Sequence, residues 1–160
     1  MPNINRYTYM FEHMSVKITN GQKKPNKAIM LLSVIELIRC GYIVENKIYI
    51  EDTIQEAFEH TWKKYIDDNP PTGWTPFWHL NSEPFWHFKP MFSYEAIESI
   101  TKPGETAALS KMKSTIKYAY LDDELYDLLV DKTYRTNICE VLQKLVLGNN
   151  DFSRAKSATQ

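Results

Sequence analysis

A chain of 160 residues is long enough to bury a hydrophobic core within one domain. A formal net charge of −1 excludes the strongly basic class of proteins that coat nucleic acid without selectivity. The charge is unevenly distributed, because residues 1–50 carry seven Lys or Arg against three Asp or Glu, whereas residues 51–100 carry three against nine.

The first 40 residues have the apolar period of two helices. Spacings of three and four residues predict a first helix with one apolar stripe, formed by Ile4, Tyr7, Phe11, Met14 and Ile18. Asn20-Gly21 should end that helix. A second helix is predicted from Lys27 to Cys40. Because it is apolar on most sides, it should lie at the centre of the fold.

A small hairpin and a third helix are predicted next. Two short apolar runs on either side of Glu45-Asn46 favour a hairpin over residues 42–50. A capping-box pattern, Thr53 to Glu56, predicts the start of the third helix, which should end before Pro70.

The middle of the chain holds two copies of one tetrapeptide, at residues 76–79 and 84–87, with the sequence Pro-Phe-Trp-His. Proline lacks an N–H and favours extended backbone in the residue before it. The simplest prediction is therefore an aromatic hairpin with strands over 75–80 and 84–88. Such a hairpin could be a core plug between helices or the wall of a ligand cleft.

The rest of the chain returns to helical periodicity. Residues 90–103 predict a loop or a short helix, and a helix is predicted over 109–120 from the face formed by Leu109, Met112, Ile116 and Tyr120. Asp122 and Thr133 are candidate N-caps of two further helices, the last of which should end at Gly148. Residues 149–160 are polar and are expected to form a flexible tail. The predicted fold is mainly α with small β-hairpins, of the α+β class, in a single compact helical module over residues 1–148.

Cysteine usage and the N-terminus bear on the cellular compartment. Cys40 and Cys139 both lie on apolar helical patterns, which predicts small buried side chains in a reducing environment. Residues 1–6 lack the apolar stretch of a signal peptide, and no window approaches the ~20 apolar residues that span a bilayer. We therefore expect a cytoplasmic protein with no membrane partner.

The sequence shows no clear catalytic constellation. Zinc sites need clustered Cys and His, and the two cysteines are far apart in the chain. His79 and His87 could be metal ligands, donors at the edge of a cleft, or structural residues. The acidic triplet at 122–124 could hold a divalent cation, although acidic residues also favour helix N-termini. No phosphate loop or nucleophile-elbow motif is present, so we expect no catalytic residue, no metal and no cofactor.

Lysines gather in two clusters. The first is Lys23, Lys24 and Lys27, and the second is Lys102, Lys111, Lys113 and Lys117. A single cluster is typical of a solvated face, but two clusters on one domain can converge into a phosphate-binding surface.

Three segments, taken together, resemble a known domain. Residues 24–32, Lys-Pro-Asn-Lys-Ala-Ile-Met-Leu-Leu, are similar to the segment that opens the N-terminal domain of many HNH-type restriction endonucleases. Pro-Phe-Trp-His-Leu at 76–80, followed by Phe85-Trp86, resembles the Pro-Phe-Trp-Arg-Leu…Trp signature of that domain. Residues 119–129 with Arg135 resemble the helical segment that precedes the nuclease part. The chain is thus similar to the sulfur-binding domain of McrA-like enzymes, which recognises phosphorothioate-modified DNA.

This resemblance implies a set of binding residues. Asn26 and Lys27 match the pair that touches the DNA backbone, and the match to the sulfur cavity falls on Thr75, Pro76 and His79. Apart from the resemblance, the two lysine clusters are expected to add backbone contacts through Lys24, Lys102, Lys111 and Lys113. A non-bridging sulfur is larger and a poorer hydrogen-bond acceptor than oxygen. Ring carbons can therefore accept sulfur, whereas an ordinary phosphate oxygen would lose its hydration there without replacement.

The resemblance also implies partners. They are double-stranded DNA with a modified backbone and a nuclease, either fused or encoded separately. Residues 149–160 are too few to form a ββα-metal nuclease domain, so this chain is expected to bind DNA and not to cut it. Two alternatives stay open. One is a protein-interaction module that uses an aromatic patch around Trp78 and Trp86, and the other is a hydrolase with an unrecognised His/Glu site.

Overall fold

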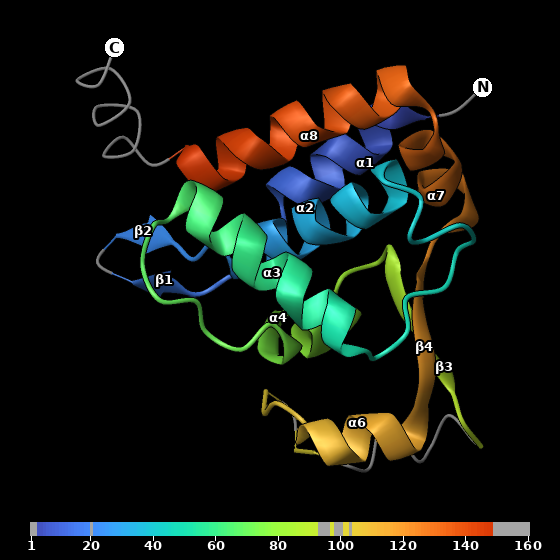
Figure 1. Ribbon diagram of the computed structural model, residues 1–160. Coiled ribbons are helices and arrows are strands. Elements are labelled where there is room, and N and C mark those ends of the chain that lie inside the picture. The colour runs from blue at the N-terminus through green and yellow to red at the C-terminus, as the bar shows by residue number, and fades with distance from the viewer. Residues whose placement is uncertain (1–2, 20, 93–96, 98–100, 103, 149–160) are drawn as a thin grey trace.

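The computed structural model describes residues 3–19, 21–92, 97, 101–102 and 104–148 (Figure 1). The helices are α1 (Ile4–Glu12), α2 (Asn26–Arg39), α3 (Asp52–Tyr65), α4 (Trp74–His79), the 3₁₀ turn η1 (Leu80–Ser82), α6 (Leu109–Thr115), α7 (Asp123–Val130) and α8 (Lys132–Leu147). The strands form two antiparallel pairs, β1 (Ile18–Thr19) with β2 (Gln22–Lys23) and β3 (Trp86–Pro90) with β4 (Ile116–Leu121). The predicted α+β class is confirmed. The predicted tail over 149–160 and most of the region 93–103 lie outside the described residues, and the boundary at 148 stays a prediction.

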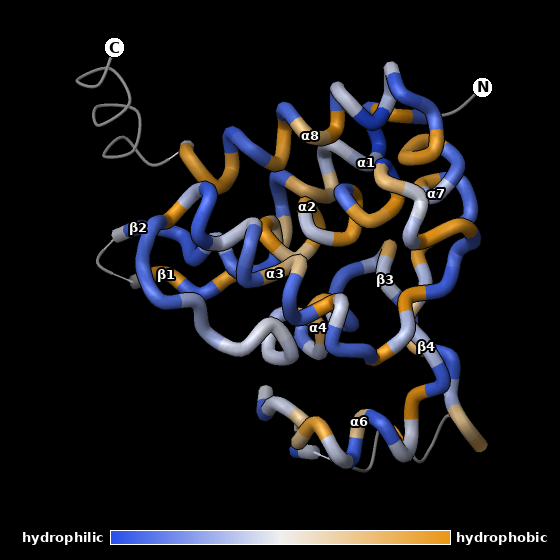
Figure 2. Tube along the Cα trace, in the orientation of Figure 1, coloured by the Kyte–Doolittle hydropathy of each residue, from blue (hydrophilic) through white to orange (hydrophobic). Residues whose placement is uncertain are grey.

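Helix α2 is the centre of the fold, as its sequence predicts. Every residue from Lys27 to Ile35 is buried, and so are Leu37 and Ile38. Helices α3, α4, α7 and α8 all pack against α2, and Figure 2 shows its apolar residues enclosed between α3 and α8. Burial of apolar surface stabilises a fold by roughly 25 cal/mol per Å² removed from water. Because α2 is buried on nearly all sides, it is held firmly in place. The start of α2 is therefore a rigid point in the molecule.

The two Pro-Phe-Trp-His copies adopt different structures, so the predicted hairpin between them is wrong. The first copy ends α4, with Pro76 in the first helical turn, where a missing N–H costs no hydrogen bond. The second copy leads into β3, which pairs with β4 in the register Trp86 to Leu121. Phe77 from the first copy is buried and meets Trp86 edge-on, with ring centroids 5.4 Å apart. A segment this rich in aromatic residues has no clear period, and helix and strand are hard to separate without one.

Two predicted helices end early, and the chain after each forms a strand. Helix α1 ends at Glu12, and residues 18–19 form β1, which turns into β2 at Gly21 with φ +77°. Helix α6 ends at Thr115, and residues 116–121 form β4. Each strand begins with a β-branched isoleucine, a residue that favours strands. Residues 42–50 form an isolated bridge, Ile48 to Ala119, in place of the predicted hairpin.

The predicted helix caps are also corrected. Helix α3 begins at Asp52, with Glu51 at the N-cap position in place of Thr53. Helix α8 begins after Asp131, whose carboxylate accepts hydrogen bonds from the N–H groups of Thr133 and Tyr134.

Asp122 precedes α7 as predicted but does not cap it through its side chain. The carboxylate instead accepts a hydrogen bond from the hydroxyl of Tyr7 at 2.9 Å, and it is 2.7 Å from His87 Nε2. Burial and the neighbouring Asp122 raise the pKa of Tyr7, which keeps its phenol protonated as the donor. Asp122 therefore ties α1 and β3 to the start of α7.

Both tryptophans of the repeated tetrapeptide belong to the core. Trp78 is 9 % exposed and Trp86 is 1 % exposed. The indole N–H of Trp78 also donates to the carbonyl of Glu105 at 3.0 Å. A protein-interaction hot spot needs aromatic rings that a partner can reach. Trp78 and Trp86 therefore do not form the exposed aromatic patch that a protein-interaction module would need.

Neither cysteine is fully buried, although the sequence predicted burial for both. Cys40 is exposed because it lies at the C-terminal end of α2, where the chain leaves the core. Cys139 is half-buried, and burial raises the pKa of its thiol. As for membrane segments, no helix in the described residues has the length and apolar character needed to cross a bilayer.

Candidate nucleic-acid interface

A pocket of about 560 Å³ brings together residues that are far apart in the sequence. It lies between the start of α2, helix α4 and the segment before α6. Six of the predicted site residues line it: Lys24, Asn26, Lys27, Thr75, Pro76 and His79. The wall is completed by Ser15, Val16, Lys17, Ser82, Gly104 and Thr106. The three predicted sulfur-binding residues and three of the six predicted backbone-binding residues therefore share one concave site.

Helix α4 supplies the apolar wall of the pocket. Its start is held by the N–H of Gly73, which donates to the side-chain oxygen of Gln55 in α3 at 2.7 Å. A Cβ atom at Gly73 would lie 2.9 Å from a ring carbon of Phe58, so α4 can approach α3 this closely only with glycine there. Pro76 is buried on this helix, while Thr75 and His79 are half-buried at the pocket.

His79 links α4 to the segment before α6. Its Nε2 atom lies 2.7 Å from the hydroxyl of Thr106, within hydrogen-bonding distance. Burial, together with the positive charges of Lys27 and Lys17, lowers the pKa of His79 below its ordinary value. The ring is therefore mainly neutral at pH 7 while the pocket is empty.

Lys27 lines the pocket but is buried, and its ammonium is bound by the protein itself. Its ammonium donates to the carbonyl of Ser15 at 2.6 Å, to the hydroxyl of Ser82 at 3.2 Å and to Glu83 Oε2 at 2.6 Å. An ammonium has three N–H groups, and these three acceptors occupy them. The N–H of Ser15 donates to the same Glu83 oxygen at 3.0 Å. Lys27 and Glu83 thus fasten the segment after α1 to η1.

The accessible positive charge comes from Lys17 and Lys24. Both are exposed at the pocket, and neither has a carboxylate partner within the described part of the chain. The described lining contains three lysines and a histidine but no Asp or Glu. A site with an electropositive rim and an apolar wall suits an anion that carries one poorly hydrated atom.

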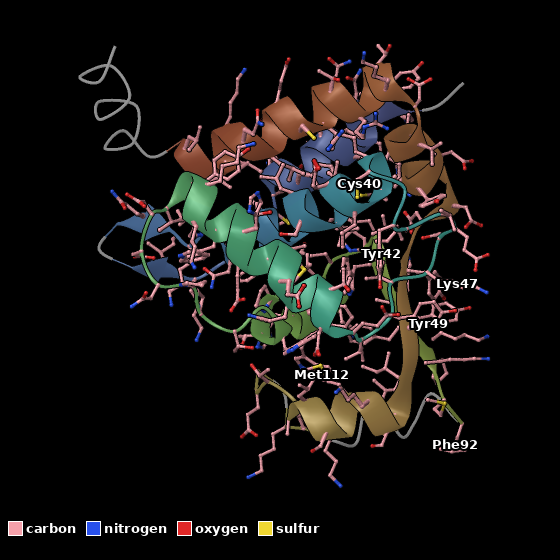
Figure 3. All side chains as sticks on the ribbon, in the orientation of Figure 1. Cys40, Tyr42, Lys47, Tyr49, Phe92 and Met112 are labelled. Carbon is pink, nitrogen blue, oxygen red and sulfur yellow. The ribbon has the colours of Figure 1, made fainter. Side chains whose placement is uncertain are left out.

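The second lysine cluster lies outside the pocket. Lys102 is exposed two residues before Gly104, which lines the pocket. Lys111 and Lys113 are exposed on α6. Figure 3 shows Met112 pointing from α6 toward α4, and this side chain is fully buried. Met112 thereby anchors α6 to the core, and the exposed Lys111 and Lys113 are available for a ligand longer than the pocket.

Half of the lining is absent from the sequence-based prediction: Ser15, Val16, Lys17, Ser82, Gly104 and Thr106. The predicted first helix covered Ser15, Val16 and Lys17, which hid their place in a connecting segment. One signal could have pointed to them, because residues 13–35 contain four lysines and no Asp or Glu.

The two histidines of the repeated tetrapeptide do not form a common site. His79 lies on α4 at the pocket, whereas His87 lies on β3 and pairs with Asp122. Within the described residues, no group of three or more His, Cys, Asp or Glu side chains could hold a metal ion.

Comparison with known proteins identifies a similar fold. No protein-family model matches the sequence, and no curated protein matches it. A solved structure, the sulfur-binding domain of SprMcrA in complex with phosphorothioated DNA, superposes with a TM-score of 0.66. The match covers 89 % of this chain and 85 % of that chain, at 16 % sequence identity. The chain therefore has the fold of the McrA sulfur-binding domain.

Proposed function

We propose that this protein binds the backbone of double-stranded DNA and recognises a phosphorothioate linkage in it. The observation that carries this proposal is the pocket, whose described lining combines the exposed, unpaired Lys17 and Lys24 and the half-buried His79 with the buried ring of Pro76. The fold shared with the DNA-bound domain of SprMcrA supports the same function.

The proposal assigns the sulfur atom to the α4 wall. The ring carbons of Pro76 offer no hydrogen-bond donor to a non-bridging atom. A phosphate oxygen placed there would lose its water without replacement, which costs about 1–3 kcal/mol in proteins. A non-bridging sulfur is more weakly hydrated than an oxygen, so its transfer into the pocket costs less free energy. Discrimination by the pocket therefore comes mainly from rejection of the ordinary phosphate.

The remaining oxygens of the linkage and the flanking phosphates face the polar rim. Lys24 and the amide of Asn26 lie at the start of α2, where helical N–H groups also favour an anion. Lys27 acts indirectly, by positioning the segment that contains Ser15 and Lys17. Lys102, Lys111 and Lys113 are proposed to contact phosphates further along the duplex. A nuclease partner, fused or separate, would act on the DNA that this module holds.

Replacing Lys24 with alanine should weaken DNA binding at every sequence by a similar factor. A protein that contacts one phosphate fewer releases about one counterion fewer when it binds DNA. The slope of log Kd against log salt should therefore become smaller by about 1. Titration of a labelled duplex at several salt concentrations measures the slope. Lys132, exposed at the α7 end of α8, provides the matched control, and its replacement should leave the slope unchanged. An unchanged slope for Lys24→Ala would remove Lys24 from the interface.

DNA binding should tighten as the pH falls from about 8 to about 5.5, because a bound anion favours the charged form of His79. Burial, Lys27 and Lys17 lower the pKa of His79 in the free protein, so a nearby phosphate must raise it and binding takes up a proton. Titrations at constant ionic strength should show a smaller pH dependence for His79→Gln. The control His60→Gln changes an exposed histidine of α3 and should keep the wild-type dependence. Equal pH dependence in all three proteins would exclude His79 from the anion site.

A further inference from the structure

The ribbon formed by β1 and β2 is a surface that the pocket does not account for. It projects from the side of the molecule opposite α7 (Figure 1). Its base is closed by a hydrogen bond from the N–H of Lys24 to the carbonyl of Lys17 at 2.8 Å, and both residues line the pocket. Val16, next to the base, packs against the core. Anything that occupies the pocket therefore lies directly beside a fixed ribbon.

The charge of the ribbon matches that of a nucleic acid. Lys17, Lys23 and Lys24 are exposed at or next to it and lack a carboxylate partner within the described residues. The nearest acidic residues along the chain are Glu12 and Glu36. A strip of positive charge next to a backbone site will be drawn toward the neighbouring phosphates.

The ribbon also exposes an apolar side chain among these lysines. Ile18 is 66 % exposed and pairs across the ribbon with Lys23. The turn at Gly21 has open space around it, since a Cβ atom there would meet nothing within 4 Å. A surface-exposed isoleucine between lysines contributes little to the fold. It is well suited to an apolar contact within a charged interface.

DNA offers such a contact in one groove. The major groove is about 12 Å wide and admits a two-stranded ribbon, whereas the minor groove is about 6 Å wide. The major groove is also where the 5-methyl group of thymine is exposed. This is the apolar group on a base edge that an isoleucine side chain can touch.

We propose that the β1–β2 ribbon enters the major groove beside the bound linkage and that Ile18 contacts a thymine methyl group there. This inference rests on the proposed function, since it uses the backbone site as its anchor. It adds base selection to backbone recognition. Lys23 contacts a phosphate at the edge of the groove, and Ile18 reads the base.

A selection experiment tests this inference. Duplexes with one fixed central linkage and randomised flanks are prepared in two pools, one with a phosphorothioate and one with an ordinary phosphate at that linkage. The wild-type protein should enrich thymine at a defined position within about half a helical turn of the linkage. Replacing that thymine with uracil, which removes only the methyl group, should weaken wild-type binding about fivefold.

Ile18→Ala should lose both the thymine enrichment and the difference between thymine and uracil, while keeping the wild-type salt slope. Lys23→Ala should do the opposite, keeping the base preference and lowering the slope by about 1. Val44→Ala is the matched control, because Val44 is 78 % exposed. It belongs to the segment between α2 and α3 that also contains Tyr42, Lys47 and Tyr49, on the side away from the ribbon (Figure 3). This variant should behave like the wild type.

Two results would overturn the inference. A wild-type protein that binds duplex with no base preference would refute base reading by the ribbon and leave the proposed backbone function intact. An Ile18→Ala protein that keeps the wild-type preference would do the same. Failure of the wild-type protein to bind either pool would refute the proposed function itself, and the ribbon inference with it.

Discussion

Replacing Glu83 with alanine should lower the free energy of unfolding by about 3–5 kcal/mol, the usual cost of breaking a buried ion pair. The side chains of Lys27 and Glu83 are 9 % and 6 % exposed, and their charged atoms lie 2.6 Å apart. Without the carboxylate, the ammonium of Lys27 stays buried with only neutral acceptors, and the N–H of Ser15 loses its partner. Urea denaturation followed by tryptophan fluorescence measures the loss.

The surface pair of Lys47 with Glu45, at 3.7 Å, provides a matched control for this change. Glu45→Ala should cost at most about 1 kcal/mol, since water solvates both groups after the pair is broken. A double replacement, Lys27→Met with Glu83→Leu, should recover part of the stability by removing both buried charges together. Equal losses for Glu83→Ala and Glu45→Ala would show that the ion pair is not buried in solution.

Replacing Pro76 with alanine should reduce the preference for phosphorothioate over ordinary duplex roughly tenfold, which corresponds to about 1.4 kcal/mol. The change removes apolar surface from the wall of the pocket while the lysines of the rim remain. The space left by the ring lets water accompany an ordinary phosphate, so binding to ordinary duplex should tighten, while its salt slope should stay the same. Competition titrations with the two duplexes measure the ratio.

The repeated tetrapeptide supplies the control for this experiment. Pro84 is followed by the same three residues as Pro76 but is exposed and lies outside the pocket lining. Pro84→Ala should keep the wild-type preference. Both replacements should cost only about 1 kcal/mol or less in stability through the greater freedom of the unfolded chain, because Pro76 occupies the first turn of α4. A preference that survives Pro76→Ala would mean that sulfur does not lie against this ring.

The structure brings six of the nine predicted site residues into one pocket, although the elements that carry them differ from the prediction. Lys24, Asn26, Lys27, Thr75, Pro76 and His79 all line one pocket, although α4 was expected to be a strand. The resemblance could place these residues together because it follows short motifs and does not depend on the secondary structure of the segments that contain them. Secondary structure failed where a dense aromatic run has neither a helical nor a strand period.

The role of Lys27 could not be predicted from its neighbours in the sequence. Its partner Glu83 lies 56 positions away, and both are brought together by the packing of α2 against η1 and the segment after α1. A lysine in a basic cluster is usually solvated, and only the fold shows that this one is buried. Lys17 was missed for a related reason, because the predicted first helix ran through it.

The affinity of the wild-type protein for one duplex with and without a phosphorothioate linkage tests the central claim most directly. Both stereoisomers of the linkage are compared with the ordinary phosphate at several salt concentrations. The account predicts that one stereoisomer binds at least roughly tenfold more tightly. Its salt slope should equal that of the ordinary duplex, because sulfur changes the apolar contact and not the number of charges. Equal affinity for all three duplexes at low salt, in several sequence contexts, would contradict the account.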